Sequence, residues 1–144
     1  MTMAWSRAEL DAFLTETPRV ARLGTVSAAG EPHVAPVWFR LDGGRLLVHT
    51  NPASRKARNV AAMGRHSTVV DKDTHPYKGA IVHGRAEIAE DVPWEPLIRE
   101  LAMAYVGPEG GAAYGQALVD LPVEHVVVGL HIERWEDWDY GAWT

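Results

Sequence analysis

Hydrophobic residues recur in short alternating runs over the first fifty positions of the chain. Apolar runs at 19–27, 33–41 and 45–50 are separated by Ala-Gly-Glu and Asp-Gly-Gly, which are turn-forming sequences. Alternation of this kind is typical of strands that turn one face toward a core. The pattern therefore predicts three strands joined by two hairpins.

The same alternation returns in the second half of the chain. It predicts a fourth strand at 66–72, a long fifth strand at 78–89 and a final strand at 124–135. Gly84, inside the long strand, indicates either a bulge or the close approach of another backbone. The sheet is therefore expected to contain six strands.

Short helices are expected at three places between these strands. Ser6 and Glu9 form a capping box that opens a helix near the N-terminus. A second helix follows the third strand, capped by Asn51 or by Ser54, and ends near Gly64. A third opens at a proline and carries an apolar stripe on one face: Pro93, then Trp94, Leu97, Ile98, Leu101 and Tyr105.

A glycine-rich stretch, 107–116, follows the third helix and reads as a flexible link. Strands and helices do not alternate, so a parallel sheet is not expected. The pattern predicts a mainly β protein, a six-stranded antiparallel barrel with short flanking helices. A chain of 144 residues suits one domain over 1–144, ending in an aromatic tail at 134–144.

Composition narrows the function classes. The absence of cysteine excludes disulfides, thiolate metal sites and thiol catalysis. The formal net charge is −5 and basic residues are scattered outside 55–58, so no nucleic-acid partner is expected. No apolar stretch approaches about 18 residues and the N-terminus lacks signal-peptide features, so we expect a cytoplasmic protein with no membrane partner.

The basic cluster lies in the stretch HTNPASRKARN, residues 49–59. Arg55, Lys56 and Arg58 fall in the first turns of the second helix, where the helix dipole disfavours cations. Backbone N–H groups in a first turn lack partners inside the helix and can donate to a phosphate. Polar side chains nearby can add further hydrogen bonds: Thr50, Ser54 and Asn59. The stretch therefore predicts a phosphate site.

A simpler interpretation is a solvated helix face, paired with some of the 19 acidic residues. The cluster occupies the disfavoured helix end, follows a strand directly and is preceded by hydroxyl and amide residues. Together these features favour a ligand.

These segments resemble the flavin-binding split barrels typified by pyridoxamine 5′-phosphate oxidase and their deazaflavin-using relatives in actinobacteria. The resemblance covers residues 8–133 and rests on the order of GEPHVAPVWF, GGRLLVHTN, SRKARN, VVDKD and GAIVHGRAEI. It implies a homodimer of six-stranded split barrels with a flavin at each interface. It also implies an oxidoreductase that passes hydride to or from a small molecule whose identity stays open.

The resemblance assigns residues to the cofactor. Thr50, Ser54, Arg55 and Lys56 would hold the phosphate, with Asn59 in support. The strand from Ala35 to Phe39 would run beside the isoalloxazine ring, through its members Ala35, Pro36, Val37 and Trp38. His49 could donate to the phosphate or the ribityl chain.

The aromatic tail has two interpretations. The tryptophans and the tyrosine of residues 134–144 close the barrel or seal the dimer by burying apolar area. Alternatively, Trp138 or Trp143 reaches the partner's flavin, as aromatic C-terminal residues do in the oxidase branch of the family.

The strand at 34–39 departs from the pyridoxamine oxidases, because it lacks the basic residues that bind cofactor and substrate there. Oxidation of pyridoxamine phosphate is therefore not expected. FMN is the expected cofactor, because Arg55 and Lys56 are adjacent and no second basic groove is evident for a polyglutamyl tail. The deazaflavin coenzyme F420, on the same fold, is the alternative. No catalytic acid or base is required, since the ring carries the hydride chemistry.

Two other function classes remain open. One is a non-catalytic module that holds a flavin, a haem or another phosphate-bearing ligand, and the other is a structural dimer with an empty cradle. The seven histidines show no metal-ligand spacing, so no metal is expected.

Overall fold

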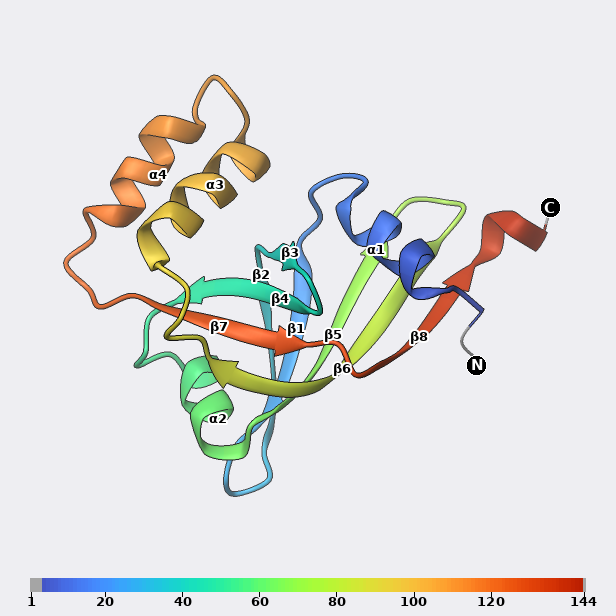
Figure 1. Ribbon diagram of the computed structural model, residues 1–144, viewed down its shortest axis with the longest axis horizontal. Helices are drawn as coiled ribbons and strands as arrows, with labels where there is room; N and C mark the ends of the chain where they lie inside the picture. Colours follow the sequence, from blue (N-terminus) through green and yellow to red (C-terminus); the bar gives the residue numbers. More distant parts are fainter. Residues whose placement is uncertain (1–3, 144) are drawn as a thin grey trace.

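The computed structural model describes residues 4–143, whose strands form one curled antiparallel sheet (Figure 1). The strands are β1 (Ala21–Val26), β2 (Pro32–Val37), β3 (Arg40–Asp42), β4 (Arg45–Thr50), β5 (Arg65–Lys72), β6 (Lys78–Ile88), β7 (Val126–His131) and β8 (Arg134–Asp139). The helices are α1 (Arg7–Thr15), α2 (Arg55–Met63), α3 (Trp94–Val106) and α4 (Gly111–Val119), with a 3-10 helix η1 (Tyr140–Trp143) at the end.

The strands follow the order β2-β1-β5-β6-β7-β4-β3, and β8 pairs with β6. The long strand β6 joins two parts of the sheet. Its first half, Lys78–His83, pairs with both β5 and β8, and its last residues, Ala86–Ile88, pair with β7. The sheet therefore curls into an open half-barrel, which confirms the expected split-barrel class. Eight strands replace the six expected, because two of the expected strands are each divided.

The first division falls between β2 and β3, where a single strand at 33–41 was expected. The Tyr105 hydroxyl of α3 lies 3.1 Å from the Phe39 backbone nitrogen and accepts its N–H. The same hydroxyl donates to the Arg19 carbonyl at 2.8 Å. A side chain distant in sequence thus takes over a backbone hydrogen bond that the strand ladder would otherwise supply.

The second division falls between β7 and β8, inside the strand expected at 124–135. Ile132 donates its N–H to the Gly44 carbonyl at 2.9 Å, and Glu133 donates to the His83 carbonyl at 2.9 Å. These bonds turn the chain from β7 onto the other half of β6. The first half of the aromatic tail is therefore part of the sheet as β8.

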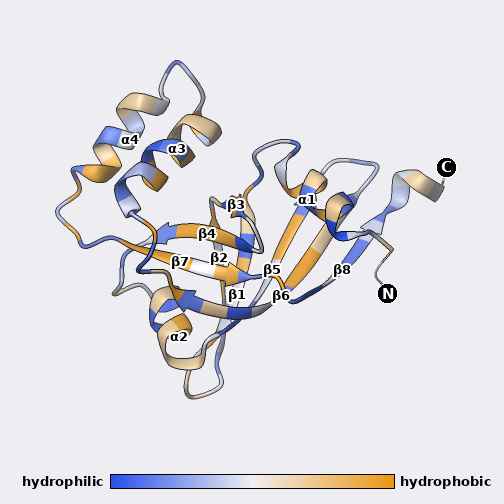
Figure 2. Ribbon diagram, in the orientation of Figure 1, coloured by the Kyte–Doolittle hydropathy of each residue, from blue (hydrophilic) through white to orange (hydrophobic). Residues whose placement is uncertain are grey.

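The main core lies inside the half-barrel, beneath α1. The capping box of Ser6 and Glu9 is present, and α1 buries Leu10, Phe13 and Leu14. Figure 2 shows hydrophobic residues concentrated along β4 and β7, which carry much of this core. Burial of such side chains contributes about 1.5–3 kcal/mol each. Within residues 4–143, no helix is both long and apolar enough to span a membrane.

The glycine-rich stretch forms a turn at 108–110 and then the start of helix α4 from Gly111, so it is not the flexible link expected from its composition. Glycine has a low helix propensity, so the sequence of this stretch does not predict a helix. The two buried glycines of α4 lie close against α3: a Cβ at Gly111 would come within 2.8 Å of the Met103 Cα, and one at Gly115 within 3.2 Å of the Ala102 Cβ. The same residues that weaken α4 on its own allow it to pack tightly on α3.

Gly84 was expected at a bulge or at a close backbone approach, and the structure shows the approach. The β5–β6 register runs without interruption through Gly84, and a Cβ there would overlap the His131 carbonyl.

Candidate cofactor site

The start of α2 is built by its own capping residues. Ser54 is the N-cap, and its hydroxyl accepts the Ala57 N–H at 3.3 Å. The Thr50 hydroxyl, at the end of β4, donates to the Ser54 hydroxyl at 3.1 Å. The N–H groups of Arg55 and Lys56 occupy the first helical positions, where no partner inside the helix exists. The strand-to-helix turn thus presents backbone donors, as expected.

The three cations of α2 are not neutralised by carboxylates. In the part of the chain that the structure describes, twelve ion pairs form, and none includes Arg55, Lys56 or Arg58. Most other arginines do have acidic partners. Unpaired cations at a positive helix end favour the binding of an anion. This observation argues against a solvated face paired with acidic residues.

These cations face two different cavities. Lys56 lines the main pocket, of about 370 Å³, whereas Arg55 and Arg58 line a separate hollow of about 350 Å³ together with Glu31 and Asn59. Consecutive residues of an α-helix point about 100° apart, so adjacency in sequence does not bring two side chains together. Nothing in the sequence indicated this second hollow, which holds two arginines separate from Lys56.

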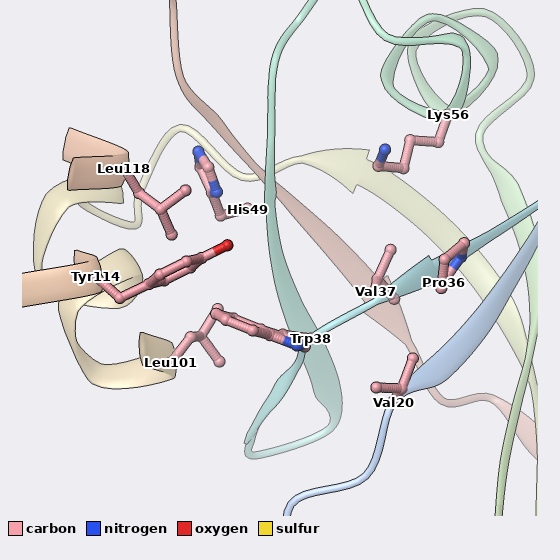
Figure 3. Close-up of a pocket in the computed structure, with 9 residues that line it drawn as sticks. All are labelled: Val20, Pro36, Val37, Trp38, His49, Lys56, Leu101, Tyr114 and Leu118. Carbon is pink, nitrogen blue, oxygen red and sulfur yellow. The ribbon is translucent and has the colours of Figure 1, made fainter. Parts of the chain in front are cut away.

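The main pocket draws its lining from both strands and helices (Figure 3). Of the β2 strand expected beside the ring, Pro36 and Val37 line it together with the next residue, Trp38, whereas Ala35 does not. His49 at the end of β4 and Lys56 of α2 supply polar groups. Further apolar lining comes from the segment before β1 and from the α3–α4 pair: Val20, Leu101, Tyr114 and Leu118.

An aromatic group forms one wall of this pocket. The rings of Trp38 and Tyr105 stack at 5.0 Å with an interplanar angle of 10°, and Tyr114 lies 5.9 Å from Trp38 at 49°. Because Tyr105 is also fixed by its hydrogen bonds to the backbone, Trp38 rests on a rigid support. The arrangement suits a planar ligand.

His49 is paired with a second histidine. Its Nε2 lies 2.7 Å from Nδ1 of His125, and Trp94 stacks on His125 at 4.3 Å. Burial, with added repulsion from His125 and Lys56, lowers the pKa of His49 to about 4, so this side chain is neutral at pH 7. Burial also lowers the pKa of Lys56. Among residues 4–143, no group of three or more His, Cys, Asp or Glu side chains is arranged to hold a metal.

Two expected site residues have other contacts within the chain. Asn59 is buried and donates from Nδ2 to the Thr25 hydroxyl at 3.1 Å, which ties α2 to β1. Trp138 lies on β8, packed against Gly79, toward the end of the molecule that carries the C-terminus (Figure 1). A contact between Trp138 and a partner's cofactor stays a prediction. The Trp143 side chain lies outside the described residues.

Two residues that line the main pocket, and one that contacts a lining residue, were not expected from the sequence. Tyr114 and Leu118 belong to α4, which was interpreted as a link, although their i, i+4 spacing places them on one helical face. His125 precedes β7 and has no local motif. Its role depends on the pairing of β4 with β7, which sets His49 against Val127 and so brings residue 125 close.

The sequence matches the family model described as pyridoxamine 5′-phosphate oxidase over residues 6–139. The chain belongs to this family. The match extends from the cap of α1 to the end of β8, so it includes the α2 start, the β2 strand and the α3–α4 pair.

A reductase resembles part of the chain. The 5a,11a-dehydrotetracycline/5a,11a-dehydrooxytetracycline reductase of Streptomyces rimosus is 39% identical over 74 residues, covering 46% of this chain and 52% of that protein. The chain thus matches about half the length of this curated relative.

Solved structures share the fold at lower identity. A conserved hypothetical protein of Mycobacterium tuberculosis is 25% identical, with a TM-score of 0.74 over 96% of this chain and 87% of the other. An F420 reductase is 23% identical, with a TM-score of 0.68 over 94% and 98%. The haem storage protein of Vibrio cholerae is 20% identical, with a TM-score of 0.68 over 92% and 93%. The last two show the fold alone.

Proposed function

We propose that the protein is an oxidoreductase that binds a phosphate-bearing flavin or deazaflavin at the start of α2 and reduces or oxidises a small planar conjugated molecule. The observation that carries the proposal is the set of unpaired cations on α2, next to a pocket with an aromatic wall. The reductase from Streptomyces rimosus supports a redox role.

The residues present fit such a cofactor. Lys56 is half-buried and has no carboxylate partner in the described part of the chain, so a phosphate near it would offset the cost of burying the charge. The free N–H groups of Arg55 and Lys56 would add hydrogen bonds. Pro36, Val37 and Trp38 would flank the ring. When bound, the cofactor supplies the hydride chemistry.

The protein's remaining contribution is orientation and the exclusion of water. Leu101, Tyr114 and Leu118 present apolar surface from α3 and α4, opposite the strand residues. Reduced water access strengthens the electrostatic interactions within the pocket and protects reactive intermediates. The aromatic wall at Trp38 favours a flat substrate over a branched one.

Between the two cofactors, the geometry supports F420 ahead of FMN. The sequence favoured FMN because no second basic groove was evident. The hollow lined by Arg55 and Arg58 offers cationic side chains, separate from Lys56, to the acidic tail of F420. FMN has no such tail and would use the α2 start alone.

Titration of the purified protein with FMN and with F420, followed by fluorescence, tests the proposal. We expect Lys56→Ala to weaken both cofactors by about a hundredfold, the value of a charge-assisted contact. Arg58→Ala should weaken F420 and leave FMN unchanged. Lys72→Ala, which removes a cation on β5 outside both cavities, is the matched control. If the wild-type protein binds neither cofactor, the proposal is wrong.

A cofactor-storing module is the second candidate, favoured by the shared fold with the haem storage protein. In this pocket, Nε2 of His49 is engaged by His125, so ligation of haem iron through that nitrogen would break the pair. A haem titration that leaves the Soret band of free haem unchanged would exclude haem storage. A bound flavin or deazaflavin that no donor or acceptor can turn over would favour storage over catalysis.

A further inference from the structure

His49 lines the main pocket and is hydrogen-bonded to His125. Phosphate binding at the start of α2 does not account for this pair. Figure 3 shows His49 on the same side of the pocket as Tyr114 and Leu118 of α4, with Lys56 of α2 on the other side. Its Nε2 is taken by Nδ1 of His125 at 2.7 Å. The free nitrogen of His49, Nδ1, is therefore the one that can meet a ligand.

The hydrogen bond between the two rings contains one hydrogen, because one ring nitrogen donates and the other accepts. In the first arrangement, His49 donates from Nε2, so its Nδ1 is a bare acceptor and His125 carries its hydrogen on Nε2. In the second arrangement, His125 donates from Nδ1, so His49 carries its hydrogen on Nδ1 and Nε2 of His125 is bare. The two arrangements present opposite hydrogen-bonding groups to the pocket.

The surroundings of His125 favour the second arrangement. Its Nε2 is buried and has no hydrogen-bond partner among residues 4–143. A buried N–H without an acceptor is rarer in proteins than an acceptor that is left under-used. The stack with Trp94 holds the His125 ring in place. His49 thus directs an N–H toward the pocket.

We infer that His49 donates a hydrogen bond from Nδ1 to a carbonyl oxygen of the substrate, and that His125 is the positioning residue that fixes the His49 tautomer. This inference rests on the proposed function, because it takes the main pocket as the place where substrate binds. An acceptor is the group that complements a neutral N–H. The stacked Trp38 would hold the conjugated plane to which the carbonyl belongs.

A donor at this position suits reduction of a conjugated carbonyl compound. A bound reduced flavin or deazaflavin would supply the hydride, and its two electrons, to the carbon β to the carbonyl. The π electrons of the substrate would then move onto the carbonyl oxygen as an enolate, and a solvent proton would give the saturated product. A hydrogen bond from His49 stabilises the negative charge as it develops on that oxygen.

Lys56 of α2 and Tyr114 of α4 line the same pocket as His49, and none of the ion pairs in the described chain includes His49 or His125. The nearby ammonium opposes a second positive charge. His49 therefore acts as a neutral donor and not as an imidazolium.

The first test is a long-range ¹H–¹⁵N spectrum of the ligand-free protein at pH 7, with the His49 signals assigned by comparison with His49→Phe. We expect the hydrogen of His49 on Nδ1 and that of His125 on Nδ1. A His49 ring with its hydrogen on Nε2 would overturn the inference. This measurement needs no cofactor, so it stands even if the cofactor titrations fail.

The second test uses chromone, a planar bicyclic carbonyl compound, and naphthalene, a planar bicycle with no acceptor. We expect chromone to bind more tightly, and His49→Phe to reduce that preference about fivefold to tenfold, the value of one hydrogen bond. An unchanged preference in His49→Phe would contradict the inference, since the variant keeps an aromatic ring but removes its donor.

The role of His125 is tested by rescue. His125→Phe should reduce the chromone preference as His49→Phe does, whereas His125→Asn should retain it, because the amide N–H can donate to Nε2 of His49. His75→Gln, at an exposed histidine of the β5–β6 loop, is the matched control. Equal loss in His125→Phe and His125→Asn would contradict the positioning role. Circular dichroism identifies any variant that fails to fold, and the wild-type spectrum decides the tautomer independently.

Discussion

The two sides of the main pocket are built in different ways. The α2 side consists of β4, a capped turn and the first helical residues, all within residues 45–58. The α3–α4 side combines residues 101, 114 and 118 with Trp38 and His125, which are far apart in sequence. The first side carries charge and backbone donors, and the second carries aromatic surface. Under the proposed function, the local motif would bind the cofactor, while residues brought together by long-range packing would form the substrate wall.

Lowering the pH should have the largest effect on the stability of the protein, and this effect should come from two histidines. Burial lowers the pKa of His49 and of His66 from 6.5 to about 4. His66 donates from Nε2 to the His131 carbonyl and accepts from Thr68 at 2.8 Å, so its neutral form is bonded on both sides. Between pH 6.5 and 4 these histidines are protonated in the unfolded chain but stay neutral in the folded chain. The free energy of unfolding is therefore highest above pH 6.5 and decreases as the pH falls toward 4.

Thermal unfolding from pH 7 to pH 4 measures this loss. The melting temperature should depend less steeply on pH in two variants than in the wild type. These are His49→Phe, which removes a histidine that lines the pocket, and His66→Asn, which removes one from β5. His75→Gln should keep the wild-type slope. A wild-type melting temperature that rises between pH 6.5 and 4 would contradict the assigned neutral state.

Gly115→Leu should disturb only the side of the pocket that α3 and α4 form. A side chain at Gly115 meets Ala102 and the Arg99 backbone on α3, so α4 must move away from α3. Overpacking of this kind costs about 1–3 kcal/mol. We expect a lower free energy of unfolding in urea and weaker chromone binding, with cofactor affinity unchanged.

Ala113→Leu is the matched control for this variant, because residue 113 is exposed on the same helix. Cofactor affinity that falls in parallel with chromone affinity in Gly115→Leu would show that the two sides of the pocket are not independent.

Tyr105→Phe tests the support beneath Trp38. The variant keeps the ring stack but removes the hydroxyl that bonds Phe39 and Arg19. A part-buried N–H left without its partner costs about 1–2 kcal/mol. Urea unfolding of this variant should show that loss, while Tyr77→Phe, at an exposed ring, should leave stability unchanged. Equal stabilities of the two variants would show that the Tyr105 hydroxyl does not stabilise the break between β2 and β3.

Ser54→Ala should have the smallest effect and should act on the α2 side. The hydroxyl caps α2 and accepts from Thr50, and the loss of such a cap costs about 1 kcal/mol. We expect this loss in urea unfolding, together with weaker cofactor binding and an unchanged preference for chromone over naphthalene. Thr17→Ala, at an exposed threonine, is the control. A changed chromone preference would show that the cap also shapes the substrate wall.

The sequence alone determined the features that depend on neighbouring residues. Alternating apolar positions located β1, β4, β5 and β6, and Gly64 located the end of α2. Of the two caps that the sequence offered, Asn51 and Ser54, the structure has Ser54. The cations of α2 were visible for the same reason, since a strand, a cap and a basic first turn follow one another directly. The pattern also predicted an antiparallel barrel, and the family resemblance added its split form and the expected cofactor.

Only the tertiary structure decided where those side chains point and what completes the pocket. The helical twist sends Arg55 and Lys56 to different cavities. The Tyr105 hydroxyl ends β2, and close packing on α3 makes a helix of a glycine-rich stretch. His125 meets His49 because β4 pairs with β7. Each outcome depends on contacts between residues distant in the chain, which local propensity and periodicity do not encode.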